Sequence, residues 1–317
     1  MEVEKAITDN SCVFAGGHRK KATCESFLGR KLNYMKDVVL GEKETVTLPN
    51  GDILPRFIYK YHPINDNLLS LIKENYVWFS NPEGFNDPYD CNLKWTNTIT
   101  DDTIESYLRF QNKLKPGFWK AEQLEENIKY TKANKEEFSS FLDNEAEIII
   151  RESGICCFSL RRDILLMWSH YSDKHSGVCL KFDMKADNKL FSSSSLVKVH
   201  YPDEYPKFDY ISYVPSTGGN FQGNLIQFCV GTKSKEWEYE YEVRLARLRN
   251  FHEPFRDRIY FNKEALIGIT FGYKTEKAKA KDILDSCNDC GYKLSEIDQS
   301  RLNDRRFGLT FDKFVPS

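Results

Sequence analysis

The segment from Glu236 to Leu245 carries the most regular arrangement of ionisable side chains in the chain. Charged residues stand at every second position, with aromatic or aliphatic residues between them. A period of two predicts a β-strand on which alternate side chains share one face. The charged face consists of Glu236, Glu238, Glu240, Glu242 and Arg244.

Three residues of this stripe, Glu240, Glu242 and Arg244, are candidates for chemistry. A carboxylate held on a strand can stabilise a developing cation, hydrogen-bond a ribose hydroxyl or act as a general base. Arg244 projects to the same face as Glu242 and can orient that carboxylate through a charge-assisted hydrogen bond. A solvated outer face is the more common origin of such a stripe, and both interpretations remain open.

A second candidate site lies within residues 156–183, a segment that predicts a short strand, a buried helical turn and a second strand. Trp168 and Tyr171, three positions apart, form either the aromatic wall of a pocket or part of the core. His170 is either catalytic or a hydrogen-bonded buried histidine. Its spacing of five residues from His175 does not fit the i, i+4 pair of a helical zinc site.

Two earlier segments add polar candidates. Residues 57–61 predict a strand on which Lys60 points opposite to the flanking tyrosines. An inward lysine would indicate a binding site, whereas an outward lysine is the commoner arrangement. In the loop 80–88, Asn86 and Asp87 can bond the local backbone or face a pocket, and the turn role is the default.

The elements that must position these residues indicate an α+β fold. The 22 Phe, 17 Tyr and 5 Trp favour sheet packing over a helical bundle. We predict a central mixed or antiparallel β-sheet, continuous or split, flanked by helices. Residues 53–317 are expected to form one domain, with a helical insertion at about 103–151, and residues 1–52 an N-terminal appendage.

The composition excludes several classes of protein. Lys and Arg number 45 against 47 Asp and Glu, which gives no strong nucleic-acid signature. No apolar run approaches the roughly 20 residues that span a bilayer, and no secretory pattern begins the chain, so we expect a cytoplasmic protein without a membrane partner. The phosphate loop, the G-x-G-x-x-G fingerprint and the G-x-S-x-G motif are absent, which argues against triphosphatases, Rossmann dehydrogenases and α/β-hydrolases.

Cysteine usage gives no indication of disulfides or a metal. Most of the nine cysteines occur in apolar runs, where a reduced thiol behaves as a small hydrophobic group. The C-x-x-C pair of Cys287 and Cys290 lacks the second pair that a four-ligand zinc site requires. We therefore expect free thiols and no bound metal.

Four motifs in this order resemble the widespread bacterial family catalogued as domain of unknown function 2971. They are Phe57-Ile-Tyr-Lys-Tyr61, Val77 to Pro88, Met167-Trp-Ser-His-Tyr171 with His175-x-Gly177, and Lys235-x-Trp237-x-Tyr239-Glu240-x-Glu242-x-Arg244. The resemblance runs from about Phe57 into the C-terminal region. It implies a bacterial cytoplasmic protein, of a family often suspected of a role in phage defence.

The layout is more distantly similar to the ADP-ribosyltransferase fold. Those enzymes place a polar residue on a first strand, an aromatic motif in the middle and a glutamate, often within E-x-E, on a late strand. Residues 59–61, 168–171 and 240–242 would occupy these places. The chain departs from that pattern because it lacks a clear Ser-Thr-Ser strand and has Lys60 or a tyrosine where those families use Arg or His.

The resemblance implies an NAD-consuming enzyme, a glycosyltransferase of the mono-ADP-ribosyltransferase or NAD glycohydrolase-like type, with NAD as its substrate. Glu242 would stabilise the ribosyl oxocarbenium ion, and Glu240 would position the acceptor. His170 would hydrogen-bond a ribose or a phosphate. The residues expected to bind NAD, by stacking on its rings or contacting its polar groups, are Lys60, Tyr61, Asn86, Trp168, Tyr171 and Arg244.

Two other functions remain open. A sensor module could bind a nucleotide or a phage component in the same pocket without catalysis. A nuclease could use Asp87, Glu240 and Glu242 with a divalent ion. The expected partners are a small-molecule nucleotide and, for a transferase, a macromolecular acceptor.

Overall fold

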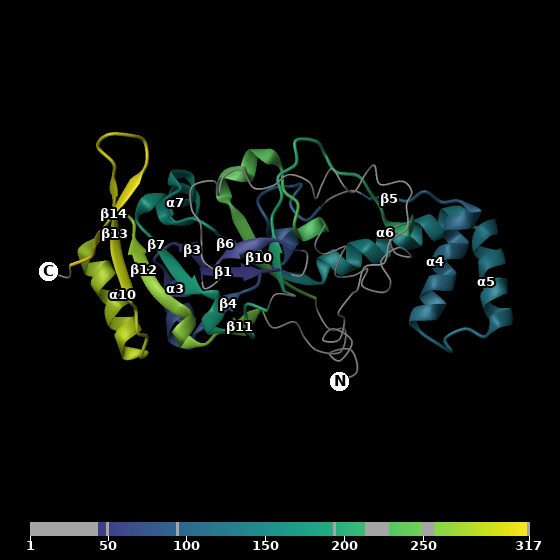
Figure 1. The fold of residues 1–317 in the computed structure, drawn as a ribbon, viewed down its shortest axis with the longest axis horizontal. Coiled ribbons are helices and arrows are strands. Elements are labelled where there is room, and N and C mark those ends of the chain that lie inside the picture. Colours follow the sequence, from purple (N-terminus) through teal and green to yellow (C-terminus); the bar gives the residue numbers. More distant parts are fainter. Residues whose placement is uncertain are drawn as a thin grey trace. The chain divides into compact units, whose positions relative to one another are not determined.

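The computed structural model describes residues 44–48, 51–92, 95–192, 195–212, 228–248 and 257–315. The predicted α+β class is confirmed, because helices flank an eight-stranded mixed sheet with the order β14-β13-β12-β7-β3-β6-β10-β8 (Figure 1). Only β12 and β13 run parallel among the neighbouring pairs of this sheet. Its strands are β3 (Phe57–His62), β6 (Ser153–Ser159), β7 (Val178–Asp183), β8 (Leu196–Lys198), β10 (Glu242–Leu248), β12 (Leu266–Phe271), β13 (Glu296–Leu302) and β14 (Leu309–Lys313).

Within the described segments, three two-stranded sheets accompany the large one. Their strands are β1 (Thr45–Thr47) with β2 (Ile53–Pro55), β4 (Tyr76–Trp78) with β11 (Arg258–Tyr260), and β5 (Trp95–Thr96) with β9 (Phe208–Asp209). The predicted appendage of residues 1–52 falls largely on residues 1–43, which lie outside the described part of the chain. The predicted domain boundary therefore stays a prediction.

One face of the sheet packs against α3 (Asp66–Glu74) and α10 (Lys277–Asp289). Each helix buries a stripe at helical spacing, which in α3 consists of Leu68, Leu71 and Ile72. Asn65 begins α3 as an N-cap, since its side chain accepts a hydrogen bond from the backbone N–H of Leu68. This core holds the alternate strand residues Ile58, Leu180, Phe182, Val243 and Leu245.

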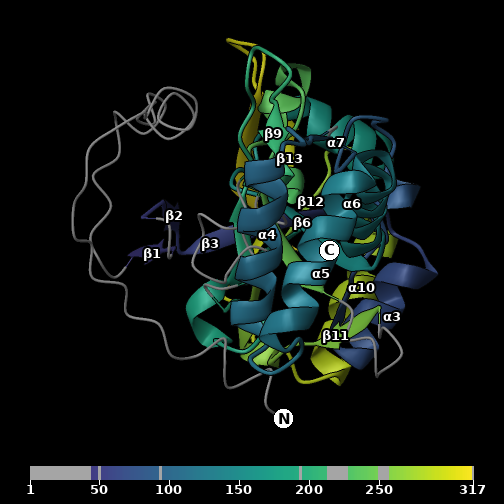
Figure 2. The ribbon, with the colours of Figure 1, turned by 90° about the vertical axis from the view of Figure 1, so that its right-hand side faces the viewer.

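The range predicted as a helical insertion contains α4 (Asp101–Leu114), α5 (Ala121–Ala133) and α6 (Lys135–Arg151) (Figures 1 and 2). They surround a second core, in which Ile104, Leu124 and Leu142 of the helices pack with Ile155 of β6 and Val197 of β8. Within the described residues, no helix combines the length and the apolar character needed to cross a membrane. The seven cysteines of the described segments are free thiols.

The sheet is open between β3 and β6. β3 forms six residue pairs with β7, and β6 forms seven with β10, whereas β3 and β6 share the single pair of Tyr59 and Ser159. Beyond that pair the two strands diverge, and the Lys60 Nζ instead donates a hydrogen bond to the carbonyl oxygen of Cys157 at 3.0 Å. The two halves of the sheet thus meet at one pair of residues.

The predicted strand–helix–strand unit is confirmed as β6, α7 (Leu165–Tyr171) and β7. After α7 the chain turns through Asp173, Lys174 and His175, which all have positive φ values, of 43°, 51° and 74°. Such left-handed backbone costs about 1 kcal/mol or more per non-glycine residue, so the surrounding contacts must hold the turn in place.

Two glycines provide the space for this turn. A methyl group on Gly272 would overlap the carbonyl oxygen of His175, and one on Gly177 would overlap that of His62. The peptide N–H of Gly272 donates to the Gly177 carbonyl at 2.9 Å, which joins β12 to the turn. The end of α7 is therefore fixed by close backbone contact with two strands.

The predicted single strand over Glu236–Leu245 is wrong in its first half. Lys235–Glu240 forms a 3-10 helix, η6, and only residues from Glu242 onward form a strand. The Tyr241 N–H donates to the Glu238 carbonyl, and Tyr241 itself has a φ of 46°. The turn relieves the repulsion that four aligned carboxylates would have on one strand, since it leaves Glu236 and Glu238 exposed while Glu240 and Glu242 are buried.

Replacing Gly272 with alanine should lower the free energy of unfolding by about 2 to 3 kcal/mol, because the added methyl group meets backbone atoms that cannot move cheaply. Urea denaturation of the purified variant measures this loss. Gly84→Ala is the matched control, since open space surrounds Gly84, and its stability should equal that of the parent. Equal stability of Gly272→Ala and the parent would contradict the close contact.

Candidate functional site

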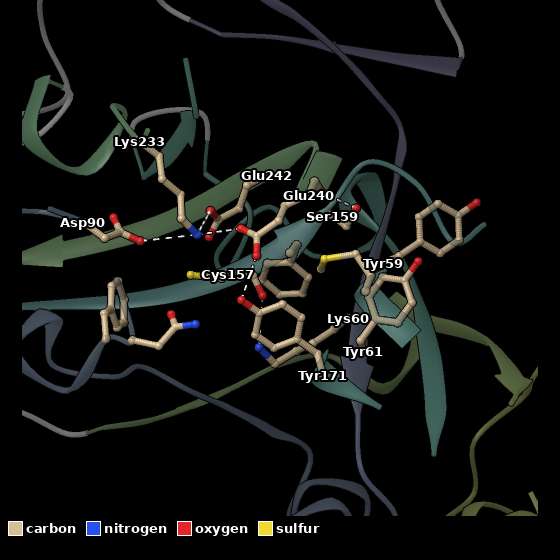
Figure 3. Close-up of a pocket in the computed structure, with 14 residues that line it drawn as sticks. Tyr59, Lys60, Tyr61, Asp90, Cys157, Ser159, Tyr171, Lys233, Glu240 and Glu242 are labelled. Carbon is tan, nitrogen blue, oxygen red and sulfur yellow. Dashed lines mark hydrogen bonds and ion pairs between the residues drawn. The ribbon is translucent and has the colours of Figure 1, made fainter. Parts of the chain in front are cut away.

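A cavity of about 170 Å³ lies where β3 and β6 diverge (Figure 3). Its walls come from six parts of the chain: the strands β3 and β6, the helix α7, the loop 85–90, the segment that ends at Lys233, and the junction of η6 with β10. Tyr59, Tyr61 and Tyr171 give it an aromatic side, and Asp90, Lys233, Glu240 and Glu242 give it a charged side (Figure 3).

Arg244 organises the charged side from behind the cavity. Its guanidinium is fully buried and donates to both carboxylate oxygens of Glu242, at 2.9 and 2.8 Å, and to both of Asp90, at 2.7 Å each. It also donates to the carbonyl oxygen of Val230 at 2.8 Å. These five bonds use all five N–H groups of an arginine.

Lys233 lies between the three carboxylates. Its Nζ is 2.5 Å from Oε2 of Glu240, 3.3 Å from Oε2 of Glu242 and 3.4 Å from Oδ2 of Asp90. The other carboxylate oxygen of Glu240 accepts a hydrogen bond of 2.7 Å from the hydroxyl of Tyr171. The carboxylates are thus bridged by one ammonium group and tied to α7.

The environments of Glu240 and Glu242 move their pKa values apart. Burial alone would raise the pKa of Glu242, but the charges and hydrogen bonds of Arg244 and Lys233 lower it to about 2. Burial, with the charge of Glu242 beside it, raises the pKa of Glu240, and Lys233 offsets only part of this rise. Glu242 therefore stays ionised near neutral pH, whereas Glu240 is the carboxylate suited to exchange a proton.

The charges of the buried cluster do not balance. Asp90, Glu240 and Glu242 supply three negative charges against the two positive charges of Lys233 and Arg244, which leaves one negative charge when all are ionised. Lys60, also on the cavity wall, is the next cation, and its ammonium group contacts the Cys157 carbonyl. The cluster suits a positively charged group or a proton at Glu240.

Six of the nine residues predicted for the site line this cavity: Lys60, Tyr61, Asn86, Tyr171, Glu240 and Glu242. The predicted orientation of Glu242 by Arg244 is confirmed by their two hydrogen bonds. Arg244, expected to contact a polar group of NAD, has a fully buried side chain whose donors bond Glu242, Asp90 and Val230 within the protein.

His170 and Trp168 also differ from their predicted roles. His170 is exposed, its ring centroid lies 6.5 Å from that of Tyr239, and it does not line the cavity. Trp168 is fully buried and meets Tyr61 edge to face at 5.3 Å, with its indole N–H bonded to the Arg162 carbonyl. Trp168 therefore supports the aromatic wall from behind, and its ring is closed to a ligand.

Asp90 and Lys233 are site residues that the sequence interpretation missed. Asp90 follows the turn-forming residues 86–88, and Lys233 follows Thr232, which forms a bridge with His200. Both signals were weak, because a lone aspartate in a loop and a lone lysine usually face solvent. Asp87, the acid assigned to a metal, caps its own turn by accepting from the Tyr89 N–H.

A family model described as "Protein of unknown function (DUF2971)" matches residues 167–245, which confirms the predicted resemblance over this segment. The matched segment contains α7 from Met167 onward, Lys233, both glutamates of the cavity and Arg244. No significant match was found among curated proteins or among solved structures.

Replacing Arg244 with methionine should lower the free energy of unfolding by about 3 to 5 kcal/mol, because it leaves Asp90 and Glu242 buried without their main counter-ion. Arg301→Met is the matched control. Arg301 pairs with Asp312 at 2.7 Å, but both side chains are more than half exposed, so the loss there should stay below about 1 kcal/mol. Equal losses in urea denaturation would contradict the central role of Arg244.

The low pKa of Glu242 predicts a pH-dependent stability. Because this pKa lies at about 2 in the folded protein against an ordinary 4.5, the ionised group stabilises the fold fully above about pH 4.5. That contribution is lost as the pH falls from about 4.5 towards 2. The difference in unfolding free energy between the parent and Glu242→Gln, measured in urea, should therefore shrink over this range, and a constant difference would speak against it.

Proposed function

We propose that the protein is an NAD-consuming effector, an ADP-ribosyltransferase or NAD glycohydrolase-like enzyme that takes part in bacterial defence against phages. The observation that carries the proposal is the pair Glu240 and Glu242, which face one cavity with pKa values moved in opposite directions. Two carboxylates separated in this way can divide the roles of charge stabilisation and proton transfer.

Breaking the bond between ribose and nicotinamide needs both roles. Positive charge develops on the ribosyl ring as nicotinamide leaves, and the incoming nucleophile must lose a proton. Glu242 remains ionised, so its negative charge stabilises the ribosyl cation. Glu240 accepts the proton of water or of another acceptor, which its higher proton affinity favours.

The rest of the cavity matches the parts of a dinucleotide. The rings of Tyr61 and Tyr171 stack on nicotinamide or adenine, and Trp168 holds Tyr61 in place. Lys60 is the cation on the cavity wall that contacts the pyrophosphate, beside the amide of Asn86. The cavity thus has an acidic end for a cationic ring and a basic residue for phosphate.

The arrangement of the sheet also supports the proposal. The predicted similarity to the ADP-ribosyltransferase fold requires a first-strand residue, a middle aromatic motif and a late-strand glutamate to meet. Here β3 supplies Lys60, α7 supplies Tyr171, and β10 supplies Glu242 to one cavity. The role in phage defence depends on the family resemblance alone.

The two alternative functions differ in what they require of this cavity. A sensor would bind a nucleotide in the cavity without forming a product, and the geometry of the cavity is compatible with this. A metal-dependent nuclease fits less well, because Glu240 and Glu242 are paired with Lys233 and Arg244. Across the described segments, no group of three or more His, Cys, Asp or Glu residues is arranged to hold a metal ion.

Replacing Glu242 with glutamine should reduce nicotinamide release from NAD by at least about 100-fold, because the negative charge facing the ribosyl cation is lost. Chromatography of reactions with a bacterial lysate present supplies the readout. Glu238→Gln is the matched control, since Glu238 is exposed four residues earlier and should be dispensable. Circular dichroism and NAD binding establish that each variant is folded.

Three results separate the hypotheses. Release by the parent and by Glu238→Gln but not by Glu242→Gln supports NAD consumption. Undiminished release by Glu242→Gln would remove the catalytic role of that residue. Binding of NAD by the parent without any release would instead favour the sensor.

A further inference from the structure

Lys233 is a buried cation to which the proposed roles of Glu240 and Glu242 assign no part. Its side chain is 4% exposed and contacts all three acidic groups of the cluster, most closely Glu240 at 2.5 Å. Its ammonium group also lies 4.8 Å from the centre of the Trp237 ring, within cation–π range. A lysine enclosed in this way loses most of its hydration and is held by the acids around it.

The backbone around Lys233 is fixed relative to the cluster. The Lys233 N–H donates to the His200 carbonyl at 3.0 Å, next to the bridge between His200 and Thr232. Three residues earlier, the Val230 carbonyl accepts from Arg244. The lysine is therefore held by the same guanidinium that holds Asp90 and Glu242.

The two cations are not equivalent for Glu240. Arg244 gives two hydrogen bonds to Asp90 and two to Glu242, and none to Glu240. The Glu240 carboxylate receives one bond from the neutral Tyr171 hydroxyl and one from Lys233. Without Lys233, three carboxylates would face one arginine, and Glu240, whose only ion pair within the described part of the chain is with Lys233, would take up a proton.

We propose that Lys233 is a positioning residue that keeps Glu240 ionised and directed into the cavity, so that Glu240 accepts the proton of the incoming nucleophile at neutral pH. This inference rests on the proposed function. The nucleophile uses a lone pair to form its bond to the ribosyl carbon and gives its proton to Glu240. The bond from that carbon to nicotinamide breaks, and its electron pair leaves with the nicotinamide nitrogen.

The direction of the pH effect follows from the groups that surround Glu240. They are Tyr171 on α7, Glu242 and Arg244 on β10, Asp90 on the loop 85–90, Lys233, Tyr239 on η6, Tyr201 beside the Glu242 backbone, and Lys60 and Cys157 on the other cavity walls. Lys233 is the cation in direct contact and lowers the pKa of Glu240. Its removal therefore raises that pKa, and ionised Glu240 returns only at higher pH.

The test compares the parent with Lys233→Met, Lys233→Arg and Lys235→Met by following nicotinamide release from NAD between pH 5.5 and 9.5. In Lys233→Met we expect kcat at pH 7 to fall about 10-fold or more with a smaller change in KM, and the acidic limb of the profile to move up by about one pH unit or more. The variant then regains activity as the pH rises. Lys233→Arg keeps the limb near its parental position, and Lys235→Met, which changes an exposed lysine paired with Glu238, leaves the profile unchanged.

A second readout does not depend on turnover. Carbon-13 NMR of protein labelled at the glutamate carboxyl carbons, with the Glu240 signal assigned from Glu240→Gln, follows its titration directly. We expect the midpoint to rise by about one pH unit or more in Lys233→Met. An unshifted midpoint, or a kcat that falls equally at every pH, would overturn the proposal.

Two further outcomes are decided by the same measurements. If the parent releases no nicotinamide, the proposed function fails, while the NMR titration still tests whether Lys233 controls Glu240. If Lys233→Met does not fold, the double variant Lys233→Met with Asp90→Asn takes its place. In that variant the two carboxylates of Glu240 and Glu242 face Arg244, so the net charge of the cluster is one negative, as in the parent. A Glu240 midpoint above that of Asp90→Asn alone supports the direct contact, and an equal midpoint refutes it.

Discussion

The site depends on the buried guanidinium of Arg244. Five of its hydrogen bonds join the loop that carries Asp90, the strand that carries Glu242 and the segment that leads to Lys233. Charged groups removed from water are tolerated only when each has its partners, and these three segments meet because each supplies one. The cluster therefore brings together the charged side of the cavity as well as neutralising most of its charge.

The two carboxylates of the cavity differ because their partners differ. Arg244 contacts Glu242 in a planar, two-point arrangement, whereas Glu240 is left to a tyrosine hydroxyl and a single ammonium group. Residues close in sequence and alike in type thus acquire different proton affinities. The turn at Tyr241 contributes, since it places Glu240 at the end of η6 and Glu242 at the start of β10.

Residue pattern predicted the strand at residues 57–61, the strand–helix–strand unit and the helical range 103–151, while the aromatic content indicated the α+β class. The pairing of Glu242 with Arg244 at positions i and i+2 followed from the period of two. That period failed at Glu236–Glu240, where local i to i+3 hydrogen bonds and charge repulsion outweighed an alternating pattern. The pattern could not reveal Asp90 and Lys233, since their burial depends on partners distant in sequence. Which side chains of α7 face the cavity depends on how the helix is rotated, and this rotation leaves His170 exposed and Trp168 enclosed.

The single residue pair between β3 and β6 has a consequence for how the molecule responds to occupancy of the cavity. Lys60 and Tyr61 belong to the part of the sheet built on β7, whereas Glu242 belongs to the part built on β10. A compound that contacts both parts would bridge the weakest junction of the sheet. It would add contacts where the two strands share only one residue pair. Binding in the cavity would thereby strengthen the connection between the two parts of the sheet.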